Sequence, residues 1–89
     1  ASTVYNDANY NGTYGYYQAT SSTYVGSLVN DRGSSLRVYG HGVTFYEDSG
    51  YAGRYLYTTS DWNDLTGTAI NLHWGETWND RISSFYQNF

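Results

Sequence analysis

The sequence predicts an all-β fold with about eight strands, built from two Greek-key motifs packed as a β-sandwich. The composition contains no Pro, 10 Gly and 12 Tyr, which favours strands and tight turns over helices. Short alternating segments recur along the chain, and two motifs occur twice in the same order. At 89 residues the chain fits one domain, residues 1–89. The first Greek key spans about 1–40 and the second about 42–89.

Six segments show the alternation that is typical of half-buried strands. In one of them, Leu36 and Val38 would face the core while Arg37 and Tyr39 face outward. A single helical turn is predicted over residues 60–65, with Ser60 as its N-cap. The strand segments are residues 3–5, 14–17, 36–39, 43–46, 54–57 and 84–86.

The repeat has two parts. Residues 4–12 recur as residues 45–53, with an aromatic residue, an Asp, a second aromatic residue and a Gly aligned without gaps. Asn-Asp-Arg-Gly-Ser-Ser at 30–35 recurs as Asn-Asp-Arg-Ile-Ser-Ser at 79–84. The second half contains extra residues between its two motifs, and we place them near 66–75. Each half therefore predicts a hairpin, a variable loop, a polar loop and a closing strand.

The first repeated element predicts a folded hairpin. Tyr5 and Tyr10 would stack across one copy, and Tyr46 and Tyr51 across the other. A Gly that follows such an aromatic residue in a strand-like segment usually marks a positive φ or a close backbone approach. This interpretation is structural, although carbonyls freed by a sharp fold would also be available to a ligand.

The second repeated element offers a carboxylate, an amide oxygen, two hydroxyls and turn carbonyls, all of which are hard oxygen donors. This set suits Ca²⁺, which takes six to eight oxygen ligands in irregular geometry. Zinc and copper prefer nitrogen and sulfur, and the chain contains no Cys. The alternative interpretation is a pair of Asx and Ser turns that cap strands. The presence of two copies favours calcium.

The two motifs together resemble those of microbial βγ-crystallin domains. In that family, an aromatic-x-Glu/Asp-x-x-aromatic-x-Gly hairpin precedes an Asn/Asp-Asn/Asp-x-x-Ser/Thr-Ser loop. Residues 45–53 match the hairpin pattern closely, residues 5–12 match with Asn6 in the acidic position, and both loops match. The resemblance covers nearly the whole chain and implies two calcium sites between the Greek keys.

The resemblance also implies the ligands. Backbone carbonyls, serine hydroxyls and one aspartate from the opposite loop would form each site. Gly33 stands where the second loop has Ile82, so we expect the site with Ser34 to bind more weakly. The first set is Asn6, Arg32, Ser34 and Asp80, and the second is Glu47, Arg81, Ser83 and Asp31.

With one charged ligand each, the two Ca²⁺ sites belong to the weak end of calcium affinities, roughly 10⁻⁵–10⁻³ M. Such affinities suit extracellular calcium, and we expect a secreted bacterial protein that is monomeric. Calcium would mainly stabilise the fold. The net charge of −4 argues against nucleic-acid binding, and no apolar run is long enough to span a membrane.

We expect no enzyme activity, because His41 and His73 are the only imidazoles and no catalytic motif accompanies them. We expect Trp62, Trp74 and Trp78 to fill the core of the second half and to cover the calcium loops. With the abundant Tyr residues, they would alternatively form a surface for a protein or a glycan. Some relatives of the family resemble peptidase inhibitors or killer toxins, so an inhibitory or antimicrobial role is the alternative function.

Overall fold

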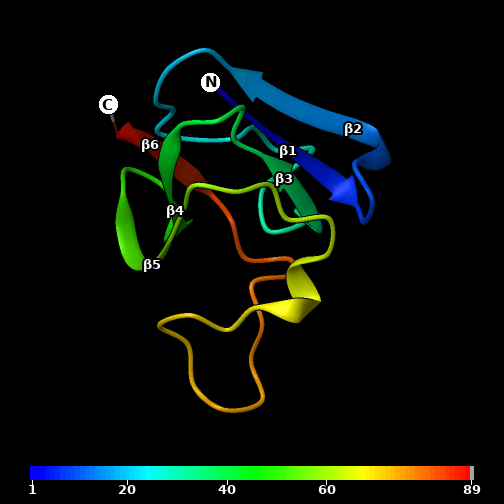
Figure 1. The fold of residues 1–89 in the computed structure, drawn as a ribbon, viewed down its shortest axis with the longest axis vertical. Helices are drawn as coiled ribbons and strands as arrows, with labels where there is room; N and C mark the ends of the chain where they lie inside the picture. Colours follow the sequence, from blue (N-terminus) through cyan, green and yellow to red (C-terminus); the bar gives the residue numbers. More distant parts are fainter. Residues whose placement is uncertain (89) are drawn as a thin grey trace.

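A computed structural model describes residues 1–88 and contains two antiparallel three-stranded sheets (Figure 1). The first has the strand order β2-β1-β3, and the second has the order β5-β4-β6. The six strands lie at all six segments that the sequence predicted. Within the described residues no helix has the length and apolar character needed to cross a membrane. The strands are β1 (Ser2–Asp7), β2 (Asn11–Gln18), β3 (Ser35–Arg37), β4 (Gly42–Asp48), β5 (Ala52–Thr58) and β6 (Ser84–Asn88).

The repeated hairpins β1–β2 and β4–β5 have the same irregularity. The register shifts between Tyr5 and Asp7 in the first hairpin and between Tyr46 and Asp48 in the second. The predicted aromatic pairs are confirmed, since the ring centroids of each lie 5.9 Å apart. Gly12 has a φ of 120°, and a Cβ there would overlap the Asn6 side chain. The folded hairpin therefore requires glycine at this position.

In each half, the segment between the hairpin and the closing strand, called here the third segment, pairs with the sheet of the other half. Ser22 forms a bridge with Phe85 of β6, and Trp62 forms one with Leu36 of β3. These isolated bridges stand where a fourth strand of each Greek key would run. The expected count of about eight strands becomes six strands and two bridges, and the two halves are interlocked.

Twelve apolar residues form one core between the sheets. Leu36 and Val38 are fully buried, while Arg37 is half-buried and Tyr39 is exposed, as the alternation predicted. The core residues are Val4, Val25, Val29, Leu36, Val38, Val43, Phe45, Leu56, Leu65, Trp78, Ile82 and Phe85.

The predicted helical turn over residues 60–65 is wrong. Trp62 instead pairs with β3, and a short 3₁₀ helix, η1, begins three residues after it, at Leu65–Gly67. Its N-cap is Asp64, whose carboxylate accepts hydrogen bonds from the Thr66 amide and hydroxyl. Both hydrogen bonds lower the pKa of the Asp64 carboxyl. Asp64 therefore takes the N-cap role that was predicted for Ser60, and the helix begins at the buried Leu65.

The extra residues of the second half lie in the long segment that follows η1, and the outer part of this segment projects away from both sheets (Figure 1). The expectation that the three tryptophans fill the core holds for one of them. Trp78 is buried, Trp62 is half-buried, and Trp74 is 101% exposed. Trp74 therefore contributes nothing to the core.

Candidate metal centre

Two loops face each other between the sheets and share their backbone hydrogen bonds. They are the predicted polar elements, residues 30–35 and 79–84. The amide of Asp31 donates to the carbonyl of Ile82 at 3.1 Å, and the amide of Asp80 donates to the carbonyl of Gly33 at 2.8 Å. This reciprocal pairing places each aspartate next to the serine loop of the opposite half.

Both aspartates adopt a left-handed backbone, with φ of 56° for Asp31 and 62° for Asp80. Asp and Asn tolerate this conformation better than most residues because their short polar side chains bond locally. The aspartates thus have a structural role, bending each loop toward its partner, in addition to carrying a carboxylate.

The serines join the loops to the hairpins. The amide of Ser34 donates to the Tyr5 carbonyl at 2.8 Å, and the amide of Ser83 donates to the Tyr46 carbonyl at 2.9 Å. The hairpin residue that follows each tyrosine, Asn6 or Glu47, is therefore held beside a serine hydroxyl.

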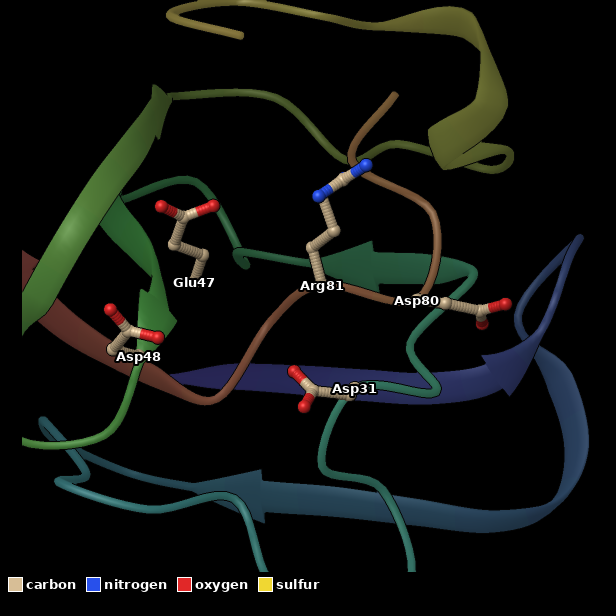
Figure 2. Close-up of a pocket in the computed structure, with 5 residues that line it drawn as sticks. All are labelled: Asp31, Glu47, Asp48, Asp80 and Arg81. Carbon is tan, nitrogen blue, oxygen red and sulfur yellow. The ribbon is translucent and has the colours of Figure 1, made fainter. Parts of the chain in front are cut away.

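At Ser83, three of the four expected ligand groups come together. Its hydroxyl lies 3.1 Å from Asp31 Oδ1 and 2.9 Å from the Glu47 carbonyl oxygen. The fourth expected residue, Arg81, lines the adjoining pocket of about 300 Å³, together with Asp48 and Asp80. Figure 2 shows the Asp31 carboxylate directed toward the space between the Arg81 loop and the strand that carries Asp48. The residues that line the pocket are therefore four acidic residues and one arginine.

The ligand groups of the other predicted site, which are Asn6, Arg32, Ser34 and Asp80, make fewer direct contacts with one another. Asp80 points to the opposite side, on which β1 ends (Figure 2). Within residues 1–88 no hydrogen bond links the Ser34 hydroxyl to Asp80, and the Asn6 side chain accepts the Tyr14 amide at 3.3 Å. Arg32 is exposed at the adjacent loop position. The structure brings these four residues into one region without the direct contacts found at Ser83.

Two arginines next to the Ser83 site are turned away from it by a four-charge network. Arg54 binds Glu47 at 3.0 Å and Glu76 at 2.8 Å, and Arg81 binds Glu76 at 3.2 Å. The Arg81 guanidinium also donates to the Thr77 carbonyl. The Arg81 guanidinium is therefore held by Glu76 and Thr77 and points away from Asp31 (Figure 2), which lessens its repulsion of a cation in the pocket.

The network sets the ionisation of its members. The hydrogen bonds from Arg54 lower the pKa of the Glu76 carboxyl to about 2, and the same guanidinium lowers the pKa of the Glu47 carboxyl. The two carboxylates in turn raise the pKa of Arg54. All three groups are charged near neutral pH, so the Glu47 side chain is engaged and its carbonyl is the group that faces Ser83.

The donor set fits a hard cation that accepts carbonyls and hydroxyls. No group of three His, Cys, Asp or Glu side chains within residues 1–88 is placed to hold a metal. A metal here would therefore depend on the Glu47 carbonyl, the Ser83 hydroxyl and one aspartate, which is oxygen chemistry typical of Ca²⁺. In the loop that carries Asp31, the side-chain oxygen Asn30 Oδ1 is buried and has no hydrogen-bond partner among the described residues. Such an atom is consistent with an ion or water nearby.

Sequence reasoning missed two parts of this region. Asp48 lines the pocket, although its position directly after Glu47 and its match to Asp7 in the repeat were signals. The network of Arg54 and Glu76 carried no signal, because Arg54 has no charged counterpart in the first half and Glu76 lies in the extra loop.

Solved structures share this whole architecture. A βγ-crystallin from an archaeon matches with 25% identity and a TM-score of 0.78, covering 98% of this chain and 95% of that one. A domain from Flavobacterium johnsoniae matches at 28% and 0.74, covering 98% and 92%. A double mutant of a domain from Clostridium beijerinckii matches at 30% and 0.71, covering 98% and 94%. The fold and its paired loops define a βγ-crystallin domain.

A narrower assignment comes from the sequence. The model of peptidase inhibitor family I36, a related crystallin-like family, matches residues 4–58, which is more than half of the chain. The chain belongs to this family of βγ-crystallin-like proteins. A search of curated proteins found no match.

Proposed function

We propose that the domain binds two calcium ions between its Greek keys and that calcium stabilises the fold without any catalysis. The observation that carries this proposal is the convergence of Asp31 Oδ1, the Ser83 hydroxyl and the Glu47 carbonyl at 2.9–3.1 Å. These atoms already lie together in the folded chain. Binding then needs no large rearrangement, and its free energy adds to folding stability.

The magnitude of the effect follows from linkage. A site that is occupied at about 100 times its dissociation constant adds roughly 2.7 kcal/mol to the free energy of unfolding. A small domain has a total of about 5–15 kcal/mol, so one ion is a large contribution. The second site, formed by Asn6, Arg32, Ser34 and Asp80, is weaker, because its side chains do not contact one another directly.

Calorimetric titration with CaCl₂ tests the proposal. We expect two binding events in the parent, loss of the tighter one in Asp31→Asn, and loss of the weaker one in Asp80→Asn. Asn is chosen because it tolerates the positive φ of both positions. Ser83→Ala should weaken the same site as Asp31→Asn. If it instead weakens the site that Asp80→Asn removes, the crossed assignment of ligands is wrong. Absence of heat at millimolar calcium rejects calcium binding altogether.

The match to family I36 favours peptidase inhibition as a second candidate function. The experiment is to measure hydrolysis of peptide substrates by secreted serine peptidases and metallopeptidases with the domain added in stoichiometric amounts. Inhibition that saturates at one domain per enzyme supports this candidate. If no enzyme is inhibited at micromolar concentrations, the family match reflects the fold alone.

A further inference from the structure

A second hollow lies in the first half, beside β2. It is an open groove of about 320 Å³ between β2 and the loop that follows it. Leu28 is 52% exposed at one wall and Tyr14 is 42% exposed at the other, while Val25 and Val29 form a buried floor. The groove contains no charged side chain; it is lined by Tyr14, Gly15, Tyr16, Val25, Gly26, Ser27, Leu28 and Val29.

The groove runs beside the outer edge of β2. This strand pairs only with β1, and it is the outermost strand of its sheet (Figure 1). The Tyr5 carbonyl faces β3, because it accepts the Ser34 amide. Backbone groups alternate along paired strands, so Val4 faces Tyr16 and the carbonyl of Gly15 points outward. Within residues 1–88 no backbone hydrogen bond reaches this outer edge of β2.

The internal repeat provides a second strand edge, that of β5, for comparison with the outer edge of β2. Tyr14 corresponds to Arg54, because each amide donates to the side chain of the equivalent hairpin residue, Asn6 or Glu47. Gly15 therefore corresponds to Tyr55, which faces Tyr46 as Gly15 faces Tyr5.

In the second half this position is filled by the chain itself. The Asn71 side chain donates to the Tyr55 carbonyl at 2.8 Å, and Leu72 packs partly buried against the core. The edge of β5 is thus covered by the extra loop, and the first half has no such loop.

We propose that the groove beside β2 binds an uncharged peptide segment of another protein. The segment would be held as the turn at residues 69–72 is held beside β5, where a side-chain amide donates to the edge carbonyl. An aliphatic side chain would lie between Tyr14 and Leu28, and a neighbouring donor would reach the Gly15 carbonyl. The edge strand favours a segment that carries a hydrogen-bond donor, because the outward carbonyl of Gly15 is unpaired. The uncharged lining selects an uncharged one, since burying a charge there has no compensating partner.

The probe is a capped synthetic peptide with the sequence of residues 68–72, followed by ¹⁵N NMR of the intact domain. We expect saturable shifts at the amides of Gly15, Tyr16 and Leu28. Leu28→Glu should weaken binding by about tenfold, because a carboxylate would have to be desolvated in the groove. Ile70→Glu is the matched control, since Ile70 is 48% exposed and does not line the groove. It should bind the peptide like the parent.

Three results would overturn the proposal. The first is no shift at Gly15 with peptide at millimolar concentration. The second is a set of shifts confined to Tyr55 and Leu56, which would mean that the peptide displaces the loop from β5. The third is a concentration-dependent dimer through β2 without any peptide, seen by sedimentation, which would make a second copy of this chain the occupant. Melting curves of both variants verify that each is folded.

Discussion

The carboxylate of Asp31 lies 3.1 Å from the hydroxyl of Ser83, although 52 residues separate them in the chain. The backbone amide of Asp31 also donates to Ile82, one residue before that serine. A side chain of the first Greek key therefore completes an oxygen cluster of the second. A cation bound there would connect the two halves directly, which is why calcium should raise the stability of the whole domain.

Replacing Asp31 by Asn should separate the structural role of this residue from its role as a ligand. Asn tolerates the same φ and accepts the same Ser83 hydrogen bond, so stability in EDTA should change little. The calcium-dependent gain, about 2–3 kcal/mol at high occupancy, should be lost for this site. Urea unfolding with and without CaCl₂ measures both quantities. Asp64→Asn, an exposed N-cap position, is the control and should keep the full gain.

Removing the hydroxyl of Ser84 should destabilise the domain with or without calcium. This buried hydroxyl donates to the Asp48 carbonyl at 2.6 Å and accepts the Tyr51 amide at 3.1 Å. Ser84→Ala leaves both backbone groups without that partner, at a cost of about 1–3 kcal/mol. Ser35→Ala should cost a similar amount, because Ser35 makes the same pair of bonds to Asp7 and Tyr10. Urea midpoints provide the measurement, and no loss in either variant would contradict this role.

Gly33→Ala should also destabilise the domain, although Gly33 does not have a positive φ. A Cβ at this position would lie 2.7 Å from Cγ1 of the buried Val4. Overpacking of this kind costs about 1–3 kcal/mol. Combining Gly33→Ala with Val4→Ala removes the clash, so the double variant should be more stable than the sum of the two single effects predicts. Strictly additive free energies would show that the loop moves aside instead.

The attachment of the projecting loop should depend on pH in a defined direction. Arg54 lowers the pKa of Glu76 to about 2 from an ordinary value near 4.5. The stabilisation from this carboxylate is therefore complete above about pH 4.5 and is lost as the pH falls toward 2. The His73 amide donates to Glu76 Oε1 at 3.0 Å, so its ¹⁵N chemical shift should follow the protonation of Glu76. A midpoint near 4.5 would mean that the ion pair does not hold in solution, and Glu76→Gln should show no titration at this amide.

The structural features that occur in both copies of the repeat could be predicted from the sequence. The paired tyrosines, the glycine of each hairpin and the facing serine loops are local patterns that recur, so a second copy supported the first. The exchange of the third segments, Ser22 to β6 and Trp62 to β3, was not predicted, because neither segment has a strand long enough to show alternation. Trp74 was misplaced because a tryptophan in a loop has the same composition signal whether it is buried or exposed. The ion pairs of Arg54 depend on tertiary contacts alone.

The exchanged bridges mean that neither Greek key contains all the pairing partners of its own last strand. Cutting the chain at the exposed turn around His41 should therefore not release two independent pieces. The fragments on either side of the cut should remain associated, and each should acquire order only when the other is present. Two polypeptides produced separately and then mixed would reconstitute the domain by complementation.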